Sequence, residues 1–192
     1  MALQSITNVP MSSDVWEQSS QPTVLGGLGI QKASDVAMPA YISSVASSAD
    51  IVSIIVPESL RNEKLANLSR TWQNKTGLIA SPAEANCKKQ AAWTKIQTAQ
   101  KAESILENAE VITRSRLLAA SRMESAAWLS ALPVATIGNL LDDSSLRIAV
   151  ALRLGAVICT EHLCICGQKV DKHGHHGLLC KKAMDDLQGT AP

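Results

Sequence analysis

The sequence predicts a mainly α-helical protein, an irregular helical bundle followed by a small Cys/His-rich module built from a short β-hairpin and a helix. Residues 83–132 contain neither Gly nor Pro, and apolar side chains recur at helical spacing from Trp93 to Ala109. Four of the five cysteines and all four histidines lie between Cys159 and Cys180. The length of 192 residues suits a single domain with a loose end.

The core of the bundle is expected to be made of small aliphatic side chains, because the chain has no Phe, one Tyr and four Trp. A buried Ala removes little surface from water, and burial contributes only ~25 cal/mol per Å². We therefore expect modest stability from the helical part. The net charge of +1 excludes a strong overall attraction to nucleic acid.

Local start and stop signals predict where the helices lie. Ser34-Asp35 and Asp142 are N-cap residues, and Ser81-Pro82-Ala83-Glu84 combines a cap with a proline in the first turn. Gly77 and Gly155 follow apolar runs and are typical helix ends. We expect helices over about 36–48, from Pro57 to about 73, 82–109, 111–121, 146–154 and 177–187, with 82–109 and 111–121 either separate or joined.

These signals predict four segments. Residues 1–24 are polar and are expected to be a loose lead-in, residues 25–157 a helical linker domain, residues 158–187 the Cys/His module, and residues 188–192 a disordered tail. The segment Gly26–Ile30 is expected to be a glycine turn, not a phosphate loop, because its spacing is not G-x-G-x-x-G.

Nothing in the sequence predicts secretion or a membrane span. The N-terminus lacks a basic segment followed by an apolar run, and the apolar stretch Ile51–Pro57 is far shorter than the ~20 residues of a span. We expect an intracellular protein of the cytoplasm or nucleus, without a membrane partner. Thiols stay reduced there, which favours a metal site over disulfides in the Cys cluster.

The Cys/His segment predicts a structural zinc site. Such a site takes four ligands, usually as two pairs from local turns. Cys164 and Cys166 would point the same way at i and i+2 of an extended segment, with Gly167 allowing the chain to fold back. His176 and Cys180 would share one face of a helix at i and i+4. The predicted ligand pattern is C-x-C-x9-H-x3-C.

Other residues of the segment remain as reserve ligands. Cys159, His162 or His175 could replace one of the four or orient it from behind. Cys159 is also a candidate for a small core residue, as is Cys87. A catalytic Cys–His pair lacks a third group to orient its base. Asp142-Asp143 is better explained as a helix cap than as a Mg²⁺ site, and we do not expect an enzyme.

Four motifs occur in an order that resembles one protein family. They are Gly26-Gly27-Leu28-Gly29-Ile30, then Trp128-Leu129-x-x-Leu132-Pro133, then Leu146-Arg147-Ile148-Ala149-Val150-x-Leu152-Arg153-Leu154-Gly155, and the C-x-C-G…H-G-L-L-C run. This arrangement is similar to the region that follows the reverse transcriptase domain in proteins of non-LTR (LINE-like) retrotransposons. The C-x-C spacing departs from the usual zinc knuckle of that family.

The resemblance implies a fragment of a longer protein. The family's polymerase domain would precede residue 26, and its endonuclease would follow the knuckle; neither is expected in this chain, and both are expected partners. In the family the intervening region is taken to help hold RNA or target DNA. The expected function is thus a non-catalytic zinc-binding linker that contacts nucleic acid.

Basic residues around the predicted site could contact phosphates. They are Lys169, Lys172, Lys181 and Lys182. Acidic residues balance these charges within the same segment, so we expect weak RNA or DNA binding that depends strongly on salt. The alternative is a helical protein-interaction or structural module in which zinc acts only as a folding staple.

Overall fold

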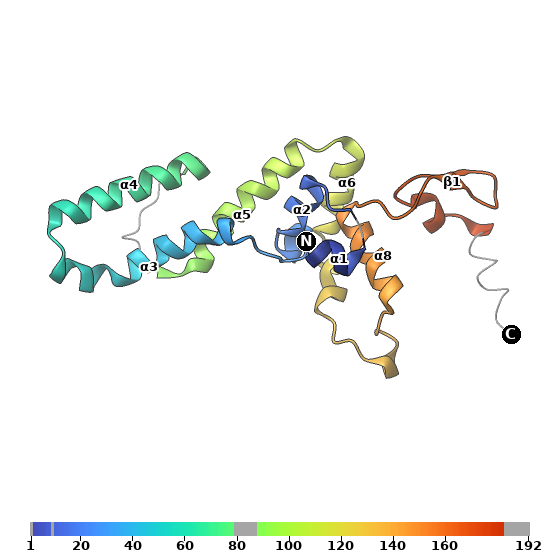
Figure 1. Ribbon diagram of the computed structural model, residues 1–192, viewed down its shortest axis with the longest axis horizontal. Helices are drawn as coiled ribbons and strands as arrows, with labels where there is room; N and C mark the ends of the chain where they lie inside the picture. Colours follow the sequence, from blue (N-terminus) through green and yellow to red (C-terminus); the bar gives the residue numbers. More distant parts are fainter. Residues whose placement is uncertain (1, 9, 79–87, 183–192) are drawn as a thin grey trace.

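The computed structural model describes residues 2–8, 10–78 and 88–182, and its architecture confirms the mainly helical prediction. Figure 1 shows an elongated molecule with a helical hairpin at one end, a central group of helices, and a small two-stranded module at the other end. The α-helices are α1 (Ala2–Thr7), α2 (Ser13–Ser19), α3 (Ala33–Ile55), α4 (Glu58–Thr76), α5 (Gln90–Glu107), α6 (Val111–Ala120), α7 (Met123–Ala126) and α8 (Asp143–Leu154). Short 3-10 helices are η1 (Thr23–Leu25), η3 (Ala127–Ser130), η4 (Ala135–Ile137) and η5 (His175–Leu178).

One apolar core joins α3, α4 and α5. Its buried side chains are Ile42, Ala46, Leu68, Trp72 and Trp93. The rings of Trp72 and Trp93 meet edge to face, with centroids 4.9 Å apart and planes at 84°. Aromatic pairs favour this geometry because the positive ring edge meets the negative ring face. Two tryptophans thus supply bulk that the aliphatic composition lacks.

A second core joins α2 to α8 and positions the Cys/His module. Its buried side chains are Val15, Val150, Ala151, Leu154 and Ala156. The chain leaves α8 through this core, since Ala156 follows the terminal Gly155 directly. The attachment point of the module is therefore fixed by packing on α2.

The glycine turn between α2 and α3 is held by a buried arginine. Arg153 is only 7% exposed and donates from Nε to the carbonyl of Gly27, at 3.1 Å. Its Nη1 and Nη2 donate to the carbonyls of Ser125 and Thr23, at 2.9 and 2.7 Å. Gln18 donates from Nε2 to the carbonyls of Gly26 and Arg153, both at 2.9 Å. The turn is a structural anchor, as expected from its lack of a phosphate-loop spacing.

The N-terminal segment is not the loose lead-in that its composition suggested. α2 is capped by Ser12, whose Oγ accepts from the N–H of Val15 at 3.3 Å. Four polar residues at the end of α2 and directly after it are buried: Gln18, Ser19, Ser20 and Gln21. Burial of these side chains is tolerated because carbonyl groups of the glycine turn and of α2 satisfy several of their donors. Composition alone could not reveal those partners.

Two predicted helix starts differ in the structure. α3 begins at Ala33 and runs to Ile55, so Ser34 and Asp35 lie in its first turn and Pro39 lies inside it. α5 begins only at Gln90, because Lys89 has an extended backbone with φ −104° and ψ 116°. The predicted start at Ser81–Glu84 falls outside the described residues, as does Cys87. Helices α5 and α6 are separate.

The predicted caps elsewhere are confirmed. Gly77 and Gly155 end α4 and α8 in the left-handed region, with φ of 71° and 65°. Asp142 caps α8 by accepting from the N–H groups of Ser144 and Ser145, at 2.9 and 3.0 Å. Such caps satisfy N–H groups that have no partner within the helix.

Helix α3 is longer and more apolar as a whole than the run Ile51–Pro57 indicated. Among the described residues, it alone has the length and composition to cross a membrane, with a mean hydropathy of 1.3 over its most apolar window. Core helices of soluble proteins pass the same test when they are mostly buried, whereas 22% of this window is buried. The inner face of α3, with Ile42 and Ala46, packs in the first apolar core.

Candidate metal centre

The first two predicted ligands lie at the tip of a β-hairpin. Strand β1 (His162–Leu163) pairs antiparallel with β2 (Lys169–Val170), in the register His162 to Val170 and Leu163 to Lys169. The N–H of Cys164 donates to the carbonyl of Gln168 at 2.9 Å. The N–H of Gly167 donates to the carbonyl of Cys164 at 2.8 Å, and Gly167 has φ 85°. Cys164 and Cys166 therefore converge through a turn, not along an extended segment as predicted.

The second pair comes from a 3-10 helix and the residues after it. η5 holds His176, and Cys180 follows it, so the predicted helical i, i+4 relationship is replaced by a tighter 3-10 turn. Gly174 enters η5 with φ 68°. The predicted α-helix 177–187 is wrong over residues 177–180, which form the end of η5 and a turn; residues 181 and 182 are helical, and residues 183–187 fall outside the described residues. Contact between β2 and η5 brings the two pairs together.

The four side chains form one compact cluster. The ligand atoms of Cys164, Cys166, His176 and Cys180 all lie within 4.8 Å of one another. Sγ of Cys166 lies 3.1 Å from Nε2 of His176, and Sγ of Cys164 lies 3.6 Å from Sγ of Cys180. With bonds of ~2.3 Å, sulfurs around a tetrahedral zinc are about 3.8 Å apart. The cluster can therefore bind a metal ion with small adjustments.

The metal-free thiol of Cys164 resists ionisation. The pKa of Cys164 lies above its ordinary value: the N–H of Cys166 lowers it, but desolvation and the thiols of Cys180 and Cys166 outweigh that effect. A metal must displace these protons because the thiolate is the ligand. Cys180 is 5% exposed, so one ligand is shielded from solvent while the other three are half-buried.

The reserve ligands have other partners. The thiol of Cys159 donates to the carbonyl of Asp171 at 3.3 Å. Nδ1 of His162 lies 2.9 Å from the carbonyl oxygen of Thr160, and His162 is exposed. Nδ1 of His175 lies 2.9 Å from Oδ2 of Asp171. None of the three belongs to the cluster.

Asp171 is a positioning residue that the sequence prediction missed. Its Oδ1 accepts from the backbone N–H of His175 at 3.0 Å, while its Oδ2 contacts the ring of the same residue. Its carbonyl also accepts from Gly174 at 2.9 Å. Desolvation raises the pKa of Asp171, but the hydrogen bonds from the ring and the backbone N–H of His175 outweigh this and leave it lowered. The Asp-x-x-x-His spacing was the available signal for this turn.

The four lysines predicted to contact phosphates differ in whether an acidic side chain pairs with them. Nζ of Lys169 lies 2.6 Å from Oε2 of Glu161, and this carboxylate raises the pKa of Lys169. Lys172, Lys181 and Lys182 are exposed and form no ion pair within the described part of the chain. Three of the four cations are thus free to meet an external anion.

No family model, curated protein or solved structure matches this chain.

Proposed function

We propose that the chain is a non-catalytic zinc-binding module of a retroelement reverse transcriptase protein and that it contacts RNA or target DNA. The observation that carries the metal part is the convergence of three thiols and one imidazole within 4.8 Å. Thiolate and imidazole ligands suit zinc, and four such ligands are typical of a closed, tetrahedral structural site. No ligand position remains for a substrate, which favours a structural metal.

The nucleic-acid part rests on the exposed lysines. Lys172 lies in the loop before η5, and Lys181 and Lys182 directly follow the ligand Cys180. A metal that orders both segments would fix these cations relative to one another. Three ordered cations release about three counterions from a polyanion, which predicts weak, salt-sensitive binding. The retroelement part is supported by the order of the four sequence motifs.

Fluorescence anisotropy with labelled single-stranded RNA and DNA oligomers tests the proposal, using the zinc-loaded chain at low salt. The triple variant Lys172→Gln, Lys181→Gln, Lys182→Gln should weaken binding at least tenfold. The matched control is Lys64→Gln, Lys89→Gln, Lys95→Gln, which removes the same charge from exposed positions in and beside α4 and α5. Equal losses in both triple variants would indicate only nonspecific attraction, and no binding by the unaltered chain would refute the proposal.

A second candidate function is a helical protein-interaction module in which zinc serves only to stabilise the fold. The observation that favours it is the apolar end of α3, where Ile51, Ile54 and Ile55 are 65, 84 and 74% exposed. Exposed apolar groups of this kind often mark a protein contact. Sedimentation of the zinc-loaded chain tests this candidate: concentration-dependent self-association that Ile54→Lys abolishes would support it, and a monomer at all concentrations would count against it.

A further inference from the structure

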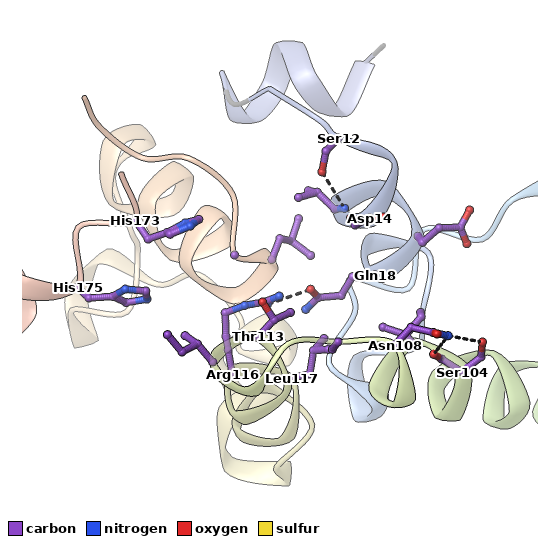
Figure 2. Close-up of a pocket in the computed structure, with 17 residues that line it drawn as sticks. Ser12, Asp14, Gln18, Ser104, Asn108, Thr113, Arg116, Leu117, His173 and His175 are labelled. Carbon is purple, nitrogen blue, oxygen red and sulfur yellow. Dashed lines mark hydrogen bonds between the residues drawn. The ribbon is translucent and has the colours of Figure 1, made fainter. Parts of the chain in front are cut away.

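A cavity lies where the Cys/His module meets the helices, and the proposed metal does not occupy it. Its volume is about 440 Å³, within the range of ~300–1,000 Å³ usual for small-molecule sites. Helices α2, α5 and α6 and the end of α8 line it, together with His173 from the loop after β2 and His175 from the start of η5, next to the proposed metal ligand His176. Figure 2 shows the two imidazoles on one side and Arg116 with Thr113 on another.

Arg116 provides hydrogen-bond donors in this cavity. Its Nη1 donates to Oε1 of Gln18 at 2.9 Å and to the carbonyl of Arg153 at 2.7 Å. Its guanidinium lies flat against Gly155, where a Cβ would come within 2.4 Å of Nε. Nε and Nη2 have no hydrogen-bond partner within the described residues, and no carboxylate pairs with Arg116 there. Desolvation lowers the pKa of Arg116, which reflects its partial burial.

The two histidines provide acceptors. Nδ1 of His173 lies 3.2 Å from the carbonyl oxygen of Ala156, and Nδ1 of His175 lies 2.9 Å from Oδ2 of Asp171. Those oxygens can only accept, so each neutral ring carries its proton on Nδ1 and leaves Nε2 as an acceptor. The two ring centroids are 5.5 Å apart and the planes are tilted by 38°. Imidazole faces can also stack on a flat ligand.

The cavity's charges disfavour a simple anion. Besides Arg116 and the two imidazoles, the carboxylates of Asp14 and Glu17 line it. Glu17 is neutralised by Lys101 and Lys32. A phosphate would face one guanidinium but also Asp14 and two nitrogen lone pairs. A ligand with both donors and acceptors on its edge fits better. The apolar side chains of Val15, Ile105, Ile112, Leu117 and Leu154 favour a flat, weakly charged body.

We infer that this cavity binds a planar nitrogen heterocycle, namely an unpaired nucleobase whose exocyclic amine donates to the imidazoles and whose ring nitrogen or carbonyl accepts from Arg116. This inference deepens the proposed function and rests on it for the source of the base. The lysines would hold the backbone of a single strand, while the cavity would receive one base. His173 and His175 stand between β2 and the ligand His176, so metal binding and base binding share one loop.

Free nucleosides test the cavity separately from the lysines. Titration of the zinc-loaded chain with adenosine, followed by amide and imidazole NMR signals, should give saturable shifts with a dissociation constant on the order of 1 mM. Purine riboside, which lacks the exocyclic amine, should bind at least about fivefold more weakly because the imidazole acceptors stay unpaired. Inorganic phosphate should not compete. Equal binding of both nucleosides, or competition by phosphate alone, would overturn the inference.

Two neighbouring residues of α6 supply a matched pair of variants. Ile112 lines the cavity and is 77% exposed, whereas Val111 is 80% exposed and does not line it. Ile112→Trp places an indole at the cavity mouth and should weaken adenosine binding at least tenfold, while Val111→Trp should change it less than twofold. The site would be refuted if both variants changed adenosine binding equally, or if the unaltered chain showed no saturable shift. Oligomer binding that survives Ile112→Trp but fails in the lysine triple variant would leave the proposed function intact.

Discussion

The sulfur atoms of Cys164 and Cys180 lie 3.6 Å apart although the two residues are sixteen positions apart in the chain. The hairpin turn supplies the first thiol, and the segment after η5 supplies the second. A metal bound by both closes this loop and removes conformational freedom from the unfolded chain, much as a crosslink does. Metal binding should therefore contribute directly to the stability of the module.

The cluster is expected to bind one zinc ion per chain. Cys180→Ser and His176→Ala should abolish binding because each removes one of the four converging ligands. Cys159→Ser should retain zinc, since Cys159 is bonded to the carbonyl of Asp171 and lies outside the cluster. Native mass spectrometry with and without chelator measures the stoichiometry. A metal-free native protein, or loss of zinc in Cys159→Ser, would contradict the ligand assignment.

Zinc affinity should fall as the pH falls. The three thiols must lose their protons to bind, and the raised pKa of Cys164 keeps that thiol protonated at neutral pH. Affinity should thus rise with pH until the pH passes the thiol pKa values, and then level off. Competition with a colorimetric chelator across pH measures the slope. An affinity independent of pH would show that the thiols are already ionised without metal.

In the glycine turn, substitution should cost much stability at Gly27 and less at Gly29, two residues later. A Cβ on Gly27 would lie 2.0 Å from the carbonyl oxygen of Gln21, so Gly27→Ala must move backbone and should cost about 2–4 kcal/mol. Gly29 has open space around it but φ +74°, so Gly29→Ala should cost only about 1 kcal/mol. Urea unfolding of both variants measures the difference. A smaller loss for Gly27→Ala would refute the close approach.

Arg153 should contribute far more to the stability of the fold than the exposed Arg147 on the same helix. Arg153→Met removes three hydrogen bonds to buried or half-buried carbonyls and should cost about 2–4 kcal/mol. Arg147→Met should change stability by less than about 0.5 kcal/mol because Arg147 is exposed. Urea unfolding compares the two. Equal effects would mean that the arginine network does not hold the glycine turn.

Acid should weaken the junction of α2, α3 and α5. Nζ of Lys101 lies 2.5 Å from Oε2 of Glu17 and 2.8 Å from Oδ2 of Asp35. Desolvation raises the pKa of Glu17, but Lys101 and Lys32 outweigh it and leave it below 4.5. A carboxylate whose pKa is lower in the folded state than in the unfolded state stabilises the fold at pH values above its unfolded pKa. That stabilisation is lost as the pH falls through the folded-state pKa. The contribution is at most about 1 kcal/mol because Glu17 is partly exposed to solvent.

Glu17→Gln should remove this contribution to the pH dependence of the free energy of unfolding below about pH 4.5. It should leave the pH dependence near neutral pH unchanged. Metal-free protein should be used, so that protonation of the zinc ligands does not enter. The control Asp14→Asn removes a neighbouring carboxylate that has no lysine partner within the described residues. Identical pH profiles for the unaltered chain and Glu17→Gln would refute the network's role.

Features that depend on near neighbours in the chain could be predicted from local residue patterns. The ends of α4 and α8 follow from Gly77, Gly155 and Asp142, because caps act within one turn of backbone. The predicted ligands Cys164, Cys166, His176 and Cys180 follow from crowding within 22 residues, and the structure brings these four together.

Contacts between groups that are distant in the chain could not be predicted and are seen only in the folded protein. The fold buries Gln18 and Ser19 of α2 and directs Arg153 inward to carbonyls more than a hundred positions away, at Thr23 and Gly27. It also forms the cavity between Arg116 and the His173–His175 loop. Local patterns cannot show these contacts, because an isolated polar side chain gives no sign of whether a buried carbonyl or water will receive its hydrogen.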